Sequence, residues 1–119
     1  VTVEPTLEKS LQAFLKEDVL SNSDKYNCEK CHKQTKARLR HELCKLPEVL
    51  IFHLKRFAFP QLKKIKGKCK FPPYLDLSKF YKGDNNYNDS LNYELIALTV
   101  HLGTLDMGHY VAFSKRMGK

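Results

Sequence analysis

The stretch that decides the fold is Leu46-Pro47-Glu48-Val49-Leu50-Ile51-Phe52-His53-Leu54-Lys55-Arg56-Phe57. Its middle, Val49 to Leu54, is a nearly continuous apolar run, which is typical of a strand that is buried on both faces. Pro47 separates the run from the mixed segment before it, and Lys55-Arg56 interrupt the apolar pattern before Phe57. We therefore expect a buried strand here.

The segment upstream of this strand predicts a helix from Thr6 to about Leu20. The Thr6 hydroxyl can accept a hydrogen bond from an early backbone N–H, and Pro5 disfavours extension of the helix backwards. The apolar side chains recur at the spacing i, i+4, i+7 and i+8 of one helix face, at Leu7, Leu11, Phe14 and Leu15. A polar loop is expected over Ser21–Asp24, where the apolar pattern has ended.

The segments downstream are predicted to be extended chain and strands. Phe71–Leu77 is expected to be extended because each proline restricts its own φ and the residue before it. Alternating side chains predict strands over Tyr93–His101 and Gly108–Lys115, and a polar loop over Gly83–Ser90. The lysines of Lys63–Lys70 predict an exposed turn between strands. The expected class is α+β, with one N-terminal helix followed by mostly antiparallel strands.

The composition indicates a single globular domain. The 119 residues are 42% hydrophobic, which allows a buried core, and no apolar run approaches the roughly 18 residues needed to cross a bilayer. Val1–Pro5 lacks the basic and apolar regions of a signal peptide, so we expect an intracellular protein, cytoplasmic or nuclear. The formal charge of +8 would attract nucleic acid, anionic lipid or an acidic protein surface, and it does not choose among them.

Two of the four cysteines, Cys28 and Cys31, form a C-x-x-C pair that suits tetrahedral zinc. One pair is half of such a site, so three interpretations stay open: a zinc knuckle completed elsewhere, which we favour; packed or relic cysteines; and redox or haem chemistry. The haem interpretation arises because His32 completes a C-x-x-C-H pattern. Cys44 and Cys69 form no second pair, and we expect them to be small core residues.

The lysine run Lys63–Lys70 also has more than one interpretation. It could bind phosphates or act as a nuclear address. A solvated hairpin tip that resists edge pairing is the interpretation we favour, and nucleic acid is therefore not an expected partner.

The tripeptide Gly108-His109-Tyr110 is the candidate catalytic motif. A histidine at the start of a strand can reach a neighbouring cleft, and histidine is the usual general base near neutral pH. The glycine before it lets another backbone approach closely. Taken alone, the tripeptide is weak evidence, and a structural histidine is the more frequent case.

The order of these motifs resembles the C-terminal half of a ubiquitin-specific protease catalytic domain. The matching stretches, in chain order, are Thr6–Leu11 with Phe14, Tyr26-x-Cys28-x-x-Cys31, Leu46–Phe57, Phe71-Pro72 with Leu75-Asp76-Leu77, and Tyr93–Leu95 leading through Val100-His101-x-Gly103 to Gly108–Ala112. The resemblance implies part of a papain-like cysteine protease fold, with a fingers segment over about residues 22–46 and a palm over about residues 47–119. The expected function is a thiol-dependent deubiquitinase.

The resemblance also implies roles for single residues. His109 would be the general base, while the nucleophilic cysteine would lie upstream of Val1 and the orienting Asp or Asn beyond Lys119. Gly108 and Tyr110 would line the channel for the Gly-Gly tail of ubiquitin. The expected zinc ligands are Cys28 and Cys31, the palm core residues are Ile51, Phe52 and Leu54, and the structural histidines are His53 and His101.

The implied partners are ubiquitin, ubiquitinated proteins and the N-terminal half of the same catalytic domain, with no membrane. The isolated 119 residues are expected to be inactive, because the nucleophile is missing. The alternative function is a catalytically inactive ubiquitin-binding or scaffold module with a zinc knuckle.

Overall fold

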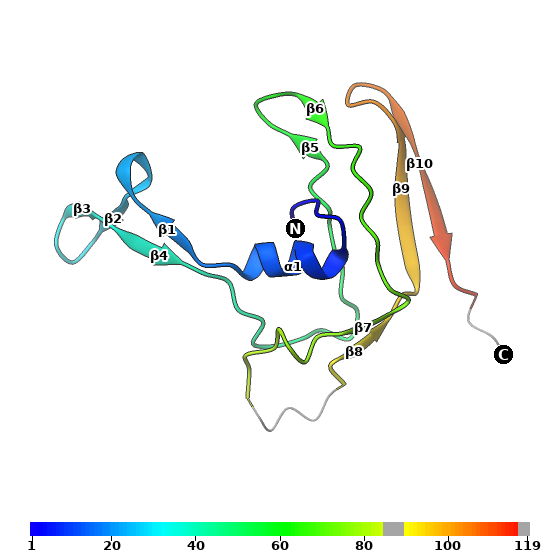
Figure 1. Cartoon of the computed structure of the whole chain (residues 1–119), viewed down its shortest axis with the longest axis horizontal. Helices are drawn as coiled ribbons and strands as arrows, with labels where there is room; N and C mark the ends of the chain where they lie inside the picture. Colours follow the sequence, from blue (N-terminus) through cyan, green and yellow to red (C-terminus); the bar gives the residue numbers. More distant parts are fainter. Residues whose placement is uncertain (85–89, 117–119) are drawn as a thin grey trace.

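The computed structural model describes residues 1–84 and 90–116 (Figure 1). The elements within these ranges are α1 (Leu7–Leu15), β1 (Asp18–Leu20), the 3-10 turn η1 (Asn22–Asp24), β2 (Tyr26–Cys28), β3 (Lys33–Thr35), β4 (Ala37–Leu39), β5 (Phe57–Ala58), β6 (Lys63–Lys64), β7 (Tyr74–Asp76), β8 (Asn92–Glu94), β9 (Ala97–Gly103) and β10 (Gly108–Ser114). The expected α+β class, one N-terminal helix followed by antiparallel strands, is confirmed.

Helix α1 begins where the sequence predicts and ends earlier. The Thr6 hydroxyl accepts a hydrogen bond from the Lys9 backbone N–H at 3.2 Å, which satisfies one of the free N–H groups at the helix start. The helix ends at Leu15, where the apolar stripe ends, so the predicted end near Leu20 was wrong. Residues Asp18–Leu20 form β1 instead, because they pair with β4.

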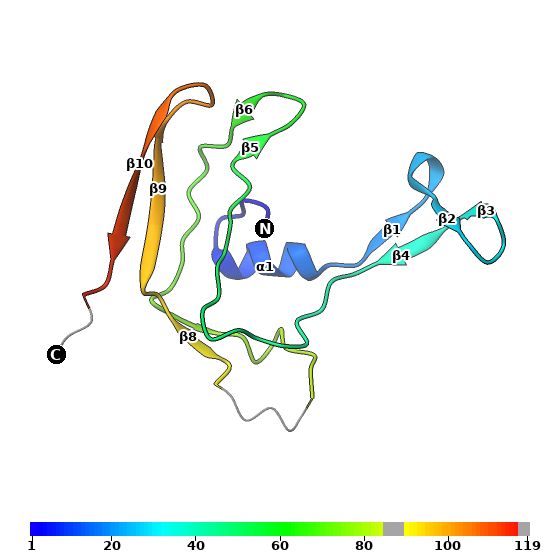
Figure 2. The same ribbon diagram turned by 180° about the vertical axis from the view of Figure 1, so that it is seen from behind.

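The strands pair in five antiparallel two-stranded sheets within the described residues. The longest pair is β9–β10, in which Ala97 lies opposite Ser114 and Gly103 opposite Gly108. The pairs β1–β4 and β2–β3 form an arm that projects away from α1, as both ribbon views show (Figures 1 and 2). The β9–β10 hairpin lies on the side of α1 away from the arm, and its turn lies at the same end of the molecule as the turn of β5–β6 (Figures 1 and 2).

The core lies where α1 meets the segment around β7. Its buried hydrophobic residues are Leu11, Leu46, Leu75 and Leu77. Partly buried hydrophobic residues pack around them, among them Leu7, Leu15, Leu43, Leu50, Phe52, Phe80, Tyr81, Leu91 and Tyr93. Ser10 is also fully buried, and its hydroxyl accepts a hydrogen bond from the Glu4 N–H at 3.1 Å, so its polarity is satisfied.

The apolar run Val49–Leu54 is not a strand buried on both faces, and this prediction was wrong. The run belongs to none of the described strands, and the side chain of Ile51 is 83% exposed. Phe52, by contrast, packs against the core. Alternate side chains of an extended chain point to opposite sides. The Phe52 side chain therefore points toward the core beside α1, while the Ile51 side chain points the other way, where no described element covers it. The described residues therefore do not bury Ile51, whereas Phe52 and Leu54 are partly buried.

The lysine run is not the tip of a hairpin, so this prediction was wrong: only its first two residues lie in a strand, and residues 65–69 belong to no described strand. The turn of the β5–β6 hairpin lies between Ala58 and Lys63, and Lys63–Lys64 already form β6. At the far end of the run, Lys70 N–H donates to Pro5 O at 2.9 Å beside the start of α1. The Arg56 guanidinium donates to the backbone oxygens of Ile65 and Gly67 at 3.1 and 2.6 Å, which fixes the segment between them.

The strand predicted over Tyr93–His101 is divided in two. β8 pairs with β7 and β9 pairs with β10, because the chain leaves one sheet at Leu95 and Ile96 and enters the other. The extended conformation expected for Phe71–Leu77 is confirmed in its second half by β7. The polar loop predicted over Gly83–Ser90 lies largely outside the described residues.

Candidate active site

The β9–β10 hairpin places His109 directly after its turn. Thr104 N–H donates to Met107 O at 2.8 Å, and Met107 N–H donates to the Thr104 hydroxyl at 3.3 Å, which closes the turn. Gly103, the last residue of β9, has a φ of +119°, a conformation that side chains rarely allow. His109 is the second residue of β10, and its side chain is exposed. An exposed imidazole at this position is free to meet a group from another element.

The register divides the three predicted site residues between the two faces of the hairpin. His109 lies opposite Leu102, while Gly108 and Tyr110 lie opposite Gly103 and His101. Directly opposed residues share a face and neighbours in sequence do not, so His109 points away from the face of Gly108 and Tyr110. Tyr110 is 61% exposed on its face.

His101 is the partly buried centre of the Gly108 face. Its ring lies 4.7 Å from the ring of Tyr110 and 5.5 Å from that of Phe57, centroid to centroid. Its Nδ1 atom is buried and has no hydrogen-bond partner among the described residues. The ring also touches Gly108, where an added Cβ would lie 2.8 Å from Cε1 and closer still to Nε2. This packing agrees with the structural role expected for His101. The His101 ring also contacts Gly108 and Tyr110, the two neighbours of His109 in the chain.

Lys64 is the residue of this region that the sequence did not reveal. Its ammonium donates to the backbone oxygens of His101 and Gly103 at 2.9 and 2.8 Å. Within the lysine run its side chain is only partly exposed, whereas that of Lys63 is exposed. No local signal separates the two lysines; only the alternation of side chains across β6 does so once the strand is known.

The second candidate site, Cys28 and Cys31, lies on the arm, far from β10 (Figures 1 and 2). Cys28 ends β2, and the tight turn after it is closed by a hydrogen bond from His32 N–H to Cys28 O at 2.8 Å. The backbone N–H of Cys31, together with its side chain and the N–H of Lys30, lowers the pKa of the Cys28 thiol. Such donors favour thiolate, the form that binds metal.

The described residues fit half of a tetrahedral zinc site and not a whole one. Over residues 1–84 and 90–116 no group of three or more His, Cys, Asp or Glu side chains is arranged to hold a metal. The remaining cysteines do not join the pair: Cys69 is partly buried and lies 4.0 Å from the buried Ser10 hydroxyl. Cys44 is exposed, so its assignment as a core residue was wrong.

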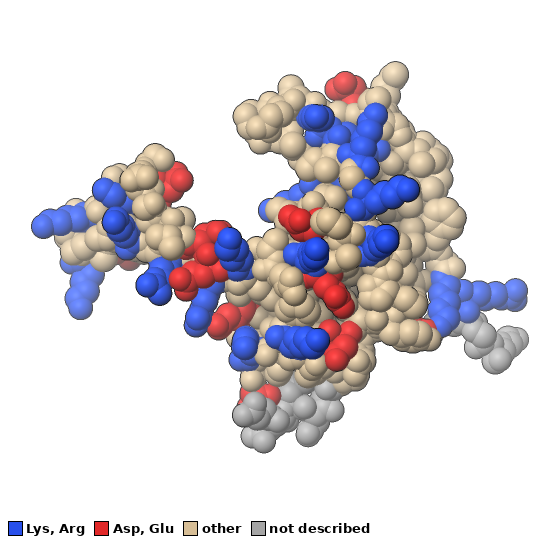
Figure 3. All heavy atoms as spheres, in the orientation of Figure 1, with Lys and Arg blue, Asp and Glu red and all other residues tan. Residues whose placement is uncertain are grey.

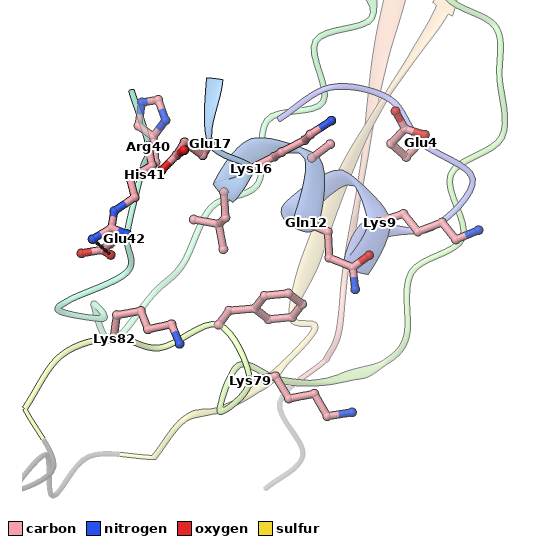
Figure 4. A pocket seen from close by; sticks show the side chains of 13 residues that line it. Glu4, Lys9, Gln12, Lys16, Glu17, Arg40, His41, Glu42, Lys79 and Lys82 are labelled. Carbon is pink, nitrogen blue, oxygen red and sulfur yellow. Dashed lines mark ion pairs between the residues drawn. The ribbon is translucent and has the colours of Figure 1, made fainter. Parts of the chain in front are cut away.

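An open groove lies beside α1 (Figure 4). It has a volume of about 740 Å³ and lies between α1, residues 40–42 and residues 79–82. Its walls carry charges of both signs, with Lys9 and Lys16 projecting from the helix and Lys79 and Lys82 from the facing segment (Figure 4). Arg40 and Glu42 form an ion pair at 3.0 Å on its rim. None of the predicted site residues lines this groove.

The family model described as ubiquitin carboxyl-terminal hydrolase matches residues 15–119, and the chain belongs to this family. The resemblance and the papain-like α+β fold are thereby confirmed.

The relatives include plant and yeast proteins. Ubiquitin carboxyl-terminal hydrolase 9 of Arabidopsis thaliana is 41% identical over 113 residues, which are 92% of this chain and 12% of the relative. Ubiquitin carboxyl-terminal hydrolase 10 of Saccharomyces cerevisiae is 32% identical over 117 residues, 93% of this chain and 14% of the relative. The chain thus spans only about an eighth of the length of these curated relatives.

A solved structure matches nearly the whole chain. In the SAGA Ubp8/Sgf11/Sus1/Sgf73 DUB module bound to ubiquitin aldehyde, one chain superposes with a TM-score of 0.77 at 29% identity, and the match covers 98% of this chain and 28% of that chain. The division into fingers and palm and the individual roles of His109, Gly108, Tyr110, Cys28 and Cys31 stay predictions.

Proposed function

We propose that this chain supplies the histidine-bearing part of a thiol-dependent deubiquitinase, an enzyme that removes ubiquitin from protein conjugates. The observation that carries the proposal is the family match over residues 15–119, which contains the whole β9–β10 hairpin with His109. The exposure of His109 supports the role, because a base must reach a nucleophile that another part of the protein provides.

In this mechanism His109 keeps a cysteine as thiolate and then acts as an acid. The thiolate attacks the carbonyl carbon of the C-terminal glycine of ubiquitin, and the imidazolium gives its proton to the departing amine. Water then attacks the carbonyl carbon of the thioester and gives a proton to His109. The carbon–sulfur bond breaks, ubiquitin leaves with its C-terminal carboxyl group free, and the thiolate and the imidazolium are restored. The cysteine, and the Asp or Asn that orients the imidazole, come from the rest of the protein.

The Gly108 face of the hairpin is the proposed wall of the channel for the ubiquitin tail. Gly108 presents only backbone there, and Tyr110 presents a flat, exposed ring. A narrow, flat wall suits an extended Gly-Gly segment, since that segment has no side chains to accommodate. The tail would pass beside His101, which already packs on both residues.

Zinc is the proposed cofactor of the arm. Cys28 and Cys31 would hold it as thiolates, and two further ligands would come from elsewhere in the protein. A bound zinc supplies a cross-link that fixes the end of the arm, with no part in the reaction at His109.

Ubiquitin and its conjugates are the proposed partners, in an intracellular setting. Nucleic acid is not proposed, because on the face drawn in Figure 3 acidic groups lie among the basic side chains around α1 and the base of the arm and interrupt the positive surface there. The described helices include none that is long and apolar enough to span a membrane.

The test uses the full-length protein and a fluorogenic amide of the ubiquitin C-terminus. His109→Ala should lower kcat by at least about 100-fold, because it removes the general base and acid. His41→Ala is the matched control: His41 is also an exposed histidine, stacked on Phe14 at 4.6 Å on the other side of the molecule, and its loss should leave turnover unchanged.

A second measurement separates the enzyme from an inactive ubiquitin-binding module. The wild-type protein should form a covalent adduct with an electrophilic ubiquitin probe. Ubiquitin binding without adduct and without turnover would identify the module instead and would reject the proposed chemistry.

A further inference from the structure

The free edge of β9 is covered by a side chain instead of a strand. Within the described residues β9 pairs only with β10, on one edge. The carbonyls of His101 and Gly103 are two residues apart and so point to the same edge of the strand. The ammonium of Lys64 donates to both, at 2.9 and 2.8 Å. Hydrogen bonds from a charged donor are stronger than neutral ones, so this contact is a firm link.

The lysine is itself held on a fixed support. Lys64 lies opposite Phe57 in the β5–β6 hairpin. Directly after it, Ile65 N–H donates to Arg56 O at 2.6 Å, and the Arg56 guanidinium donates back to Ile65 O at 3.1 Å. The same guanidinium reaches Gly67 O at 2.6 Å. The backbone on both sides of Lys64 is therefore tied down, and its ammonium connects one hairpin to the other.

The connection continues from His101 to the strand that carries His109. The ring of His101 contacts Gly108 and lies 4.7 Å from the ring of Tyr110, so it touches the residues on either side of His109. Because His109 points to the opposite face, its direction depends on where the β10 backbone is held. A shift of His101 would be passed to that backbone.

We propose that Lys64 is a positioning residue for His109, acting through the edge carbonyls of His101 and Gly103 and through the packing of the His101 ring. Lys64 does not touch the reacting atoms. Its role is to set the place of the β9–β10 hairpin relative to the β5–β6 hairpin, and so the place of the imidazole relative to the cysteine. This assignment rests on the proposed catalytic role of His109.

The first test compares Lys64→Met with Lys63→Met in the full-length protein. Methionine keeps most of the length of the side chain and removes the donors. Lys63 is the matched control, because it is the neighbouring lysine of β6 and its side chain is exposed. Lys64→Met should lower kcat for the ubiquitin amide by about 10- to 100-fold, the effect of a misplaced catalytic group, with KM within about twofold of the wild-type value.

A rescue experiment excludes a merely structural effect. Lys64→Arg keeps the positive charge and enough N–H donors for both carbonyls, so it should recover most of the lost kcat, while Lys64→Gln keeps only neutral donors and should give an intermediate value. Equal kcat for Lys64→Met and Lys63→Met, or a loss that a lowered melting temperature accounts for in all three Lys64 variants, would overturn the proposal.

Hydrogen–deuterium exchange tests the link without any activity. Lys64→Met should raise exchange in peptides from β9 and β10 and leave those from the arm unchanged. Unchanged exchange in β9 and β10 would also overturn the role of Lys64. If the wild-type protein shows no turnover but the exchange of β9 and β10 rises as expected, the proposed function fails and the link between the hairpins stands.

Discussion

The absence of a side chain at Gly108 determines how closely β9 and β10 approach each other beside His109. A Cβ added there would lie 2.6 Å from Leu102 O and 2.8 Å from His101 Cε1. The first of these atoms is backbone of the paired strand and cannot rotate away. The close approach of β9 and β10 at this point therefore requires glycine for reasons of space.

Gly108→Ala should lower both the stability and the turnover of the full-length protein. The added methyl group forces β10 away from β9, and overpacking of this kind costs about 1–3 kcal/mol in the free energy of unfolding. Because the displaced strand carries His109, kcat should fall by at least about tenfold. Chemical denaturation and steady-state kinetics measure the two effects.

Gly67→Ala provides the control. At Gly67 the nearest atoms to an added Cβ are side-chain carbons of Ile65 and Val3 at 4.0 Å, an ordinary contact. This variant should match the wild-type protein in both measurements. A Gly108→Ala protein as stable and active as the Gly67→Ala protein would contradict the close approach.

At the scale of single residues, the sequence indicated candidates that lie in a local motif and missed a residue whose contacts are far away in the chain. His109 was chosen as the candidate base because its neighbours and the motifs before it form an ordered pattern along the chain, and its role stays a prediction. Lys64 was missed because its partners, His101 and Gly103, lie 37 and 39 residues further on. Nothing within the lysine run indicates which lysine reaches them.

At the scale of elements, the arm is built from very short strands. Each strand of the pairs β1–β4 and β2–β3 has three residues. Two-stranded hairpins of this size are marginally stable alone in water. The knuckle of Cys28 and Cys31 connects β2 to β3, so a metal bound there would stabilise the element that needs it most.

Zinc content should depend on the knuckle. The full-length wild-type protein should contain about one zinc per chain by elemental analysis, and Cys28→Ser or Cys31→Ser should lose it, because serine is a poor zinc ligand. Chelator treatment should lower the melting temperature of the wild-type protein and not that of the two variants. Cys44→Ser, a change at an exposed cysteine outside the knuckle, should keep both the zinc and its effect. Wild-type zinc content in Cys28→Ser would refute the site.

Element boundaries were predicted where a local cap marks them and mistaken where pairing decides them. The start of α1 follows from the Thr6 hydroxyl and was predicted correctly. Its end at Leu15 coincides with the last residue of the apolar stripe, whereas the prediction extended the helix to Leu20. No local pattern indicates that Asp18–Leu20 pair with β4 instead. The strand predicted over residues 49–54 was also wrong. An apolar run predicts that side chains are buried, but it does not indicate which other element buries them.

At the scale of the whole molecule, the described chain is open. Its radius of gyration is 18.2 Å, whereas a compact domain of this length would have about 13.5 Å. Its extents are 60 × 46 × 22 Å, and its buried hydrophobic core is limited to four leucines among the described residues. Large apolar side chains such as Ile51, Phe59 and Met107 stay at least 80% exposed. This surface is what the rest of a catalytic domain would cover.

The isolated 119 residues should therefore neither hydrolyse the ubiquitin amide nor unfold cooperatively. A core of this size cannot offset the conformational entropy of the chain, so the melting curve by circular dichroism should be broad, and a dye that binds apolar surface should fluoresce with the fragment.

Adding the upstream part of the same protein should sharpen the transition, suppress dye binding and restore turnover, provided that His109 is intact. A sharp unfolding transition of the fragment alone, with sedimentation as a compact monomer, would mean that the fragment folds stably without another segment packed on its exposed apolar side chains. Turnover by the fragment alone would mean that the nucleophile lies within these residues.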